Sequence, residues 1–371
     1  MGAMISGYAT AEGTTRYRER RAGRVPAAHF RELPGAAWAS SIGIGTYLGR
    51  EDDATDALYQ KAIGRALERG MNVLDTAVNY RHQRSERAIG AAVAAAVRGD
   101  IGRDEVVVAT KGGFVPFDGE VPSDPGAYFQ ATYVRPGIIQ PGEVVGSHCM
   151  TPRYLRDQLD RSRANLGLQT VDVYYVHNPE TQLDEVPRPE FLTRIREAFA
   201  ALEEAGREDK LRLYGAATWN GLRADPTEPG YLSLAELVDV AREVGGSQHR
   251  FRVVQLPYNL AMPEAFTRAN QKVDGVFVST LEAARRLGMY VMASASVYQG
   301  QLTRGLPTVV TDYLPGFTSD AQRAIQFVRS TPGVGTALVG MKTLDHVEDT
   351  AGVAATSPMP WEQFKRLFNE A

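Results

Sequence analysis

The chain has 371 residues, enough for one large domain or two ordinary ones. With 43% hydrophobic and 23% charged residues and a net charge of −3, the composition indicates a globular protein without the positive charge that nucleic-acid binding needs. A single cysteine excludes an internal disulfide, no apolar run approaches the ~18 residues of a membrane helix, and no signal-peptide pattern opens the chain, so we expect a cytoplasmic protein with no nucleic-acid or membrane partner.

Residues 1–27 precede the first predicted strand. Their basic stretch, 16–24, is short and contains Glu19, which favours a flexible, solvated arm over a nucleic-acid contact. Residues 28–38 are predicted to form a small β-hairpin that seals the bottom of the fold. We expect residues 28–371 to form a single domain.

Short, β-rich runs then alternate with helical patterns. Several of the runs are apolar without alternation, as expected for parallel strands covered on both faces. The predicted strands are 39–44, 71–75, 106–110, 171–176, 211–216, 252–256, 290–294 and 336–340. The predicted helices are 54–69, 85–98, 152–166, 190–206, 232–244, 276–287, 318–330 and 343–355.

Eight strands, each followed by a helix, predict an α/β fold of the (β/α)8 TIM barrel type, whose catalytic loops leave the C-terminal ends of the strands. A doubly wound open sheet is the alternative, because periodicity alone does not show closure. Residues 360–370 are predicted to form an extra C-terminal helix. The loop after strand 3, 112–150, is long and rich in aromatic residues, so we interpret it as a lid or pocket wall. The alternative is a loop that packs on the barrel rim.

Four ionisable residues lie at the ends of three consecutive predicted strands. Asp75 and Tyr80 share the segment MNVLDTAVNY, Lys111 closes VVVATK, and His177 closes VDVYYVH. Each one alone is weak evidence, since such residues often cap turns or face solvent. Because the ends of parallel strands meet at one rim, the four together indicate a device that delivers a proton to a carbonyl group.

The chemistry of these groups suggests a role for each. An ammonium about 4 Å from a phenol contributes roughly 4 kcal/mol at an effective dielectric of 20, so we expect Lys111 to lower the pKa of Tyr80. Asp75 would keep Lys111 charged, and His177 could donate to the same carbonyl oxygen. No side chain supplies a hydride, which points to a nicotinamide cofactor.

Several segments resemble the aldo-keto reductase superfamily. They are LDTAVNYRHQRSERAIG, VVVATKGG, DVYYVHNP, VVQLPYN and GVGTALVGMKTLDHVED, which stand in that family's order and span about residues 30–355. The resemblance implies a (β/α)8 barrel that binds NADP(H), or NAD(H), in an extended form without a Rossmann domain. It also implies Tyr80 as general acid/base, Lys111 and Asp75 as the pair that tunes its pKa, and His177 as the residue that orients the substrate.

The resemblance further implies a cofactor cradle. Gln255 would hydrogen-bond the nicotinamide carboxamide, residues 293–302 would wrap the pyrophosphate, and Lys342 could pair with a 2′-phosphate at a helix N-terminus. The full set of expected cofactor contacts is Gly45, Thr46, Asp75, Thr218, Gln255, Ser294, Ser296, Gly300, Leu302, Gly340, Met341, Lys342, Thr343, His346 and Asp349. Expected substrate contacts are Tyr47, Phe114, Phe117, Asn178, Trp219 and Tyr258, a mixture that suits a small carbonyl or sugar.

The chain departs from the family pattern near the expected cofactor. Ala217-Thr218 stands where Ser-Asn is common, Ser294 where a tyrosine is common, and His346 and Thr350 where Arg or Gln and Asn are frequent. GIGTYLG at 43–49 is not a Rossmann loop, because its spacing is G-x-G-x-x-x-G and no acidic strand end follows about 20 residues further on. The six histidines lack the H-x-H and H-E-x-x-H spacings of metal sites, so no metal is expected.

These observations predict an NADP(H)-dependent oxidoreductase that reduces an aldehyde or ketone, or oxidises the matching alcohol or sugar. Two alternatives stay open. One is a redox-sensing subunit that binds nicotinamide and barely turns over. The other is a redox-neutral epimerase or dehydratase that recycles its hydride.

Overall fold

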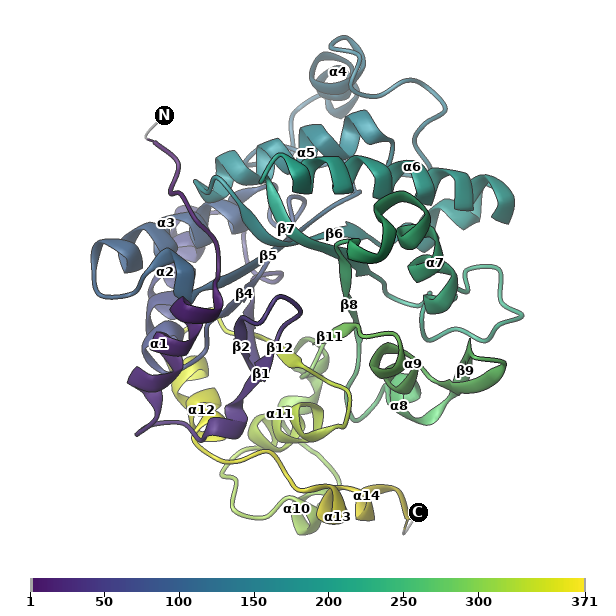
Figure 1. The fold of residues 1–371 in the computed structure, drawn as a ribbon. Coiled ribbons are helices and arrows are strands. Elements are labelled where there is room, and N and C mark those ends of the chain that lie inside the picture. Colours follow the sequence, from purple (N-terminus) through teal and green to yellow (C-terminus); the bar gives the residue numbers. More distant parts are fainter. Residues whose placement is uncertain (1–2, 370–371) are drawn as a thin grey trace.

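Eight parallel strands form a closed barrel in the computed structural model, which describes residues 3–369 (Figure 1). Around the barrel the strands follow the order β11-β12-β3-β4-β5-β6-β7-β8, and β8 pairs with β11 to complete the circle. Their bounds are β3 (Ile42–Gly45), β4 (Val73–Asp75), β5 (Val107–Gly112), β6 (Val171–His177), β7 (Leu211–Ala217), β8 (Phe251–Pro257), β11 (Tyr290–Ser294) and β12 (Thr336–Gly340). The TIM-barrel prediction is confirmed, and closure excludes the open sheet.

The strands are buried on both faces, as their unbroken apolar runs predicted. Every residue of β6 is buried, and side chains such as Val73, Val107, Val253 and Leu338 fill the interior of the barrel. Helices cover the outside of the ring (Figure 1). The helices that follow barrel strands include α2 (Asp53–Glu68), α3 (Arg84–Arg98), α5 (Pro152–Leu166), α6 (Arg188–Arg207), α7 (Leu234–Gly245), α9 (Thr280–Arg286), α11 (Asp320–Ser330) and α12 (Leu344–Ala354). Across residues 3–369, no helix combines the length and the apolar character that crossing a membrane requires.

The predicted hairpin is present at the N-terminal ends of the strands. It pairs β1 (Phe30–Glu32) with β2 (Trp38–Ser40), and Leu33 from its turn packs among the residues inside the barrel. The predicted strand 39–44 therefore joins two elements, because Ser41 separates β2 from β3.

The predicted helix at 276–287 is wrong over its first turn. Residues Val276–Ser279 form β10, which pairs with β9 (Ala269–Val273) in a second hairpin. Asp274 and Gly275 both have positive φ, 51° and 81°, as a tight hairpin turn requires. The dipeptide Asp-Gly between apolar residues was the signal that the prediction missed.

The expected flexible arm is wrong for its described part, residues 3–27. Helix α1 (Ala11–Arg21) docks on the barrel, with Tyr17 fully buried and its hydroxyl donating to Leu67 O at 2.5 Å. Arg16 and Arg20 pair with Asp104 and Glu105. The basic residues that suggested a solvated arm are thus partners of an acidic turn, and only long-range contacts reveal them. Residues 1–2 lie outside the described part of the chain.

The long connection 112–150 contains α4 (Pro125–Phe129) and a π-helical turn (Gln130–Val134), which stand outside the helix ring (Figure 1). Its side chains Tyr133, Ile139 and Cys149 form a separate apolar cluster with Tyr154 of α5. Most of this loop therefore packs on the rim, and Phe114 lines a cavity.

The C-terminal segment has two short helices instead of the one expected at 360–370. They are α13 (Trp361–Phe364) and α14 (Arg366–Asn369), and residue 370 lies outside the described residues. Two further short helices, α8 (Glu264–Thr267) and α10 (Thr308–Tyr313), were not predicted.

Candidate active site

A cavity of about 770 Å³ opens at the C-terminal ends of the barrel strands. Proteins commonly bind small molecules and cofactors in cavities of roughly 300–1,000 Å³. Predicted site residues that line it are Gly45, Thr46, Tyr47, Asp75, Tyr80, Phe114, His177, Asn178, Thr218, Trp219, Gln255, Ser294, Ser296, Gly300, Gly340, Met341, Lys342, His346 and Asp349. Residues that are up to about 300 positions apart in the sequence therefore share one cavity.

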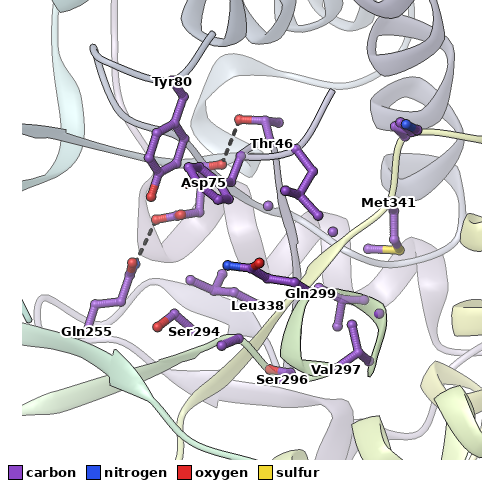
Figure 2. A pocket seen from close by; sticks show the side chains of 18 of the residues that line it. Thr46, Asp75, Tyr80, Gln255, Ser294, Ser296, Val297, Gln299, Leu338 and Met341 are labelled. Carbon is purple, nitrogen blue, oxygen red and sulfur yellow. Dashed lines mark hydrogen bonds between the residues drawn. The ribbon is translucent and has the colours of Figure 1, made fainter. Parts of the chain in front are cut away.

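Asp75 organises the floor of this cavity (Figure 2). Its Oδ2 accepts from Lys111 Nζ at 2.7 Å, and its Oδ1 accepts from Gln255 Nε2 at 2.8 Å. Lys111, whose side chain is fully buried, also donates to Thr76 O at 2.7 Å. Burial lowers the pKa of Lys111, while the charge and hydrogen bond of Asp75 oppose that shift. The predicted Asp75–Lys111 pair is therefore formed.

Tyr80 lies beside this pair, with Lys111 Nζ 5.0 Å from the centroid of its ring. Within residues 3–369 its hydroxyl makes no hydrogen bond, which leaves the proton available to a bound molecule. Burial, followed by the charge of Asp75, raises the pKa of Tyr80 well above its usual value. The pKa of Tyr80 is therefore raised and not lowered as expected, because desolvation and the charge of Asp75 both act against the phenolate. At neutral pH the tyrosine is protonated.

His177 completes the group, with its ring edge-on to Tyr80 at a centroid distance of 5.9 Å. Burial, Lys111 and His148 lower the pKa of His177 well below its usual value, so the imidazole is neutral at pH 7. Its Nδ1 is buried and has no partner within the described chain. His148 Nε2 lies 2.7 Å from His177 O, which anchors the end of the long connection to the end of β6. A neutral imidazole in this position can donate to a carbonyl oxygen.

Aromatic side chains surround Tyr80 and His177. Tyr47 packs on Tyr80 with a centroid distance of 4.9 Å, and Phe114 packs on His177 at 5.1 Å. Tyr47 and Trp219 are also partly exposed, by 55% and 40%, so they stand at the mouth of the cavity. These rings exclude water from the polar group and form a wall for a small substrate.

The other part of the cavity runs from Gln255 along β11 and β12 to the N-terminus of α12. Ser294, Ser296, Val297, Gln299 and Met341 line it (Figure 2). Further on, Lys342 and His346 contribute positive or potentially positive groups. Asp349 is held by Ser319 and Gln322 through hydrogen bonds of 3.0–3.2 Å.

Five predicted site residues do not line the cavity, and one of them, Lys111, reaches it only through its ion pair with Asp75. Phe117 packs against His82 and Tyr128, and Tyr258 is buried in a stack on Phe327. Thr343 caps α12 by accepting from His346 N, and the turn that follows β11 directs Gly300 and Thr303 to the cavity instead of Leu302. In these cases a residue's neighbour, or its own local hydrogen bond, determined where the side chain lies.

The sequence interpretation also missed residues that line the cavity, including Asn79, Tyr59, Leu48 and Thr303. Asn79 directly precedes Tyr80, so its position in the sequence was a usable signal. Tyr59 belongs to α2, and nothing in the local pattern separates it from an ordinary core tyrosine.

Buried polar atoms without a hydrogen-bond partner line the cavity, as expected where a nicotinamide dinucleotide binds. Thr218 Oγ1 and Asn79 Oδ1 are buried and have no partner among residues 3–369. Buried polar groups are normally hydrogen-bonded, so these atoms indicate a ligand with matching donors and acceptors. Gln255, Thr218 and Ser294 would hold the nicotinamide end, and Lys342 and His346 the adenosine end.

Comparison with known proteins supports this interpretation. The family model for the aldo/keto reductase family matches residues 41–226. The NADH-specific methylglyoxal reductase of Escherichia coli (strain K12) is 26% identical over 249 residues, which are 67% of this chain and 58% of that protein. The chain thus spans less than two thirds of the length of that relative.

Solved structures of similar fold cover both chains almost completely. The aldo/keto reductase from Klebsiella pneumoniae in complex with NADP and acetate has a TM-score of 0.60 and 20% identity, and covers 92% of this chain and 95% of its own. The glycerol dehydrogenase of Gluconobacter oxydans has a TM-score of 0.61 and 20% identity, and covers 92% and 94%. At this level of identity the comparison supports the fold.

Proposed function

The chain belongs to the aldo/keto reductase family of oxidoreductases, and from that premise we propose that it reduces a small aldehyde or ketone, or oxidises the matching alcohol, with NADP(H) as cofactor. The observation that carries the proposal is the meeting of Asp75, Tyr80, Lys111 and His177 at one side of a cavity that fits a dinucleotide. NAD(H) is the alternative cofactor.

A bound nicotinamide would provide the hydride chemistry, which no side chain of the cavity can supply. Tyr80 and His177 form the proton-handling side of the site. The protonated phenol donates to the carbonyl oxygen as negative charge develops on it, and the neutral imidazole donates a second hydrogen bond to the same oxygen. Lys111 lies close enough to stabilise the phenolate that remains, while Asp75 and Thr76 O hold the ammonium in place.

The charges at the adenosine end favour NADP(H). Lys342 and His346 line the cavity next to the N-terminus of α12, where backbone N–H groups and the helix dipole also attract anions. The Klebsiella pneumoniae structure contains NADP, whereas the Escherichia coli relative is named as NADH-specific, so the two cofactors need a direct comparison.

The residues near Tyr80 favour a neutral carbonyl substrate that carries a second oxygen atom. Asn79 directly precedes Tyr80 in the sequence, and Asn178 directly follows His177. Both line the cavity with amide groups. An amide whose Oδ1 is unpaired can accept from a hydroxyl group beside the reacting carbonyl. The relative from Escherichia coli is named for methylglyoxal, whose second oxygen atom belongs to a carbonyl group instead of a hydroxyl group.

The proposal is tested by comparing the wild-type protein with Tyr80→Phe. Steady-state oxidation of NADPH is measured with glyceraldehyde, methylglyoxal and propanal, and dinucleotide affinity is measured by fluorescence. We expect the variant to bind NADPH as the wild type does and to lose more than about a hundredfold in kcat, the range for removing a general acid.

Unchanged turnover in Tyr80→Phe would exclude Tyr80 as the proton donor. Failure of the wild type to oxidise either cofactor with any carbonyl, despite tight binding, would exclude the proposed reaction. A lower dissociation constant for NADH than for NADPH would reverse the cofactor assignment.

A further inference from the structure

Three consecutive residues directly after Tyr80 have left-handed backbone conformations. Arg81, His82 and Gln83 have φ values of 48°, 51° and 72°, and none is glycine. For L-residues this region is strained, and it is visited mostly by single residues. Such strain persists only where surrounding contacts determine the conformation, and it gathers at functional sites.

Arg81 provides the largest set of these contacts. Its guanidinium is buried, pairs with Asp56 of α2, and donates from Nε to Arg50 O at 2.9 Å. It also lies over the ring of Tyr59, at 5.4 Å from the centroid. Arg81 therefore joins the turn behind Tyr80 to α2 and to the loop that follows β3.

That loop lines the cavity beside Tyr80. It contains Tyr47 and Leu48, and Leu48 O accepts from the hydroxyl of Tyr59 at 2.5 Å. The ring of Tyr47 packs on the ring of Tyr80. One buried guanidinium thus connects the loop that carries Tyr47 with the turn that carries Tyr80, away from the reacting groups.

The remaining two residues of the turn differ in their side chains. Gln83 is buried, donates to Phe117 O at 2.8 Å, and accepts from Asn165 Nδ2 at 3.0 Å. His82 is only partly buried. Its carbonyl accepts from Gly119 N at 2.8 Å, while its ring packs on Phe117. The backbone contact of His82 would survive loss of its side chain.

From these contacts we propose that Arg81 is a positioning residue for the reaction: it holds the strained turn and thereby sets the place of Tyr80 relative to Tyr47 and the Asp75–Lys111 pair. The inference rests on the proposed function, in which Tyr80 is the proton donor. Arg81 itself touches none of the four reacting side chains. Its effect is on turnover, through Tyr80, and not on the affinity for the dinucleotide.

A matched pair of variants tests this role. Arg81→Gly and His82→Gly both put glycine at a position with positive φ, which relieves backbone strain, but only the first removes the guanidinium. We expect Arg81→Gly to lower kcat per dinucleotide-binding site at least tenfold, with the dissociation constant for NADPH within threefold of wild type. His82→Gly should keep kcat within twofold.

A second measurement does not need turnover. The absorbance of the Tyr80 phenolate is obtained as the difference between each protein and its counterpart that also carries Tyr80→Phe. In the wild type and in His82→Gly, Tyr80 should stay protonated beyond the ordinary tyrosine range. In Arg81→Gly it should titrate near its ordinary pKa of about 10, because the released turn exposes the phenol to water.

Asp56→Asn serves if Arg81→Gly does not fold, since it breaks the ion pair with Arg81, together with the one with Arg84, and leaves the bond from Arg81 Nε to Arg50 O. It should lower kcat in the same direction but less. Wild-type kcat in Arg81→Gly with an unshifted Tyr80 titration, or an equal loss in His82→Gly, would overturn the inference while leaving the proposed reaction intact. If the wild type shows no turnover, the proposed function fails and the Tyr80 titration alone decides the positioning role.

Discussion

Two buried ion pairs of the barrel, one toward each end, have different surroundings. At the N-terminal end, Arg103 pairs with Asp172 at 2.6 Å, and at the C-terminal end Lys111 pairs with Asp75 at 2.7 Å. Asp172 also accepts from Ala9 N and Val108 N, so the docked N-terminal segment and β5 cover it. Asp75 and Lys111 instead lie next to the cavity.

The difference extends to neutral polar groups. Near the N-terminal ends, Asn72 bonds to Trp38, Ser40 and Glu105, and Thr336 Oγ1 donates to Ser40 O. Near the C-terminal ends, Thr218 Oγ1 and His177 Nδ1 have no partner within the described chain. In these examples the N-terminal end pairs its neutral polar groups within the fold, whereas two polar atoms at the C-terminal end stay available to bound molecules.

The largest expected effect comes from breaking each ion pair by the same change. Lys111→Met and Arg103→Met each leave a buried carboxylate without its cation, which costs about 3–5 kcal/mol of unfolding free energy. Under conditions where both fold, Lys111→Met should lose more than about a hundredfold in kcat and Arg103→Met should keep wild-type kcat. Urea denaturation and NADPH oxidation measure the two effects.

Equal losses of kcat in both variants would remove the distinction between the two ends. Wild-type kcat in Lys111→Met would show that its ammonium has no part in proton transfer.

The next largest effect is a loss of stability at low pH, which we expect from two buried imidazoles. His29, bonded to Gly70 O and Ser41 Oγ near the hairpin, has its pKa lowered to about 3 by burial, and His148 has its pKa lowered to about 4 by burial. A lowered pKa stabilises the fold above the unfolded value near 6.5, and this stability is lost as the pH falls toward the folded value. Each should cost roughly 2 kcal/mol by pH 5.

Urea midpoints between pH 7.5 and pH 4.5 test this expectation. Either His29→Gln or His148→Gln should flatten the decline, and only His148→Gln should also change kcat, since His148 anchors His177 O. A flat wild-type profile would contradict the buried, neutral state of both rings.

The smallest effect compares two threonines. Thr218→Val removes a hydroxyl that has no partner among residues 3–369, so stability should stay the same or rise, while NADPH binding weakens about three- to tenfold. Thr336→Val removes a hydroxyl bonded to Ser40 O and should cost about 1 kcal/mol without weakening NADPH binding. Isothermal calorimetry and urea denaturation separate the two, and a destabilised Thr218→Val would mean that its hydroxyl has a partner in the fold.

The sequence predicted the elements where local patterns are strong. The seven predicted strands from 71–75 onward match the barrel strands within two residues at either end. Strands that are buried on both faces are continuous apolar runs, which are easily recognised in the sequence. Helix α1 was missed because Tyr17 is its one large buried apolar side chain and its other contacts are ion pairs with Asp104 and Glu105. The β9–β10 hairpin was missed although the dipeptide Asp274-Gly275 is a typical sequence of a hairpin turn.

The linear order of residues determined which chemical groups reach the rim of the barrel, because each predicted strand end fixes where its last side chain emerges. The tertiary structure decided what those groups experience. Burial and the charge of Asp75 raise the pKa of Tyr80. Packing against other aromatic rings turned Phe117 and Tyr258 away from the cavity. Desolvation and side-chain direction depend on neighbours hundreds of residues away, which no local pattern contains.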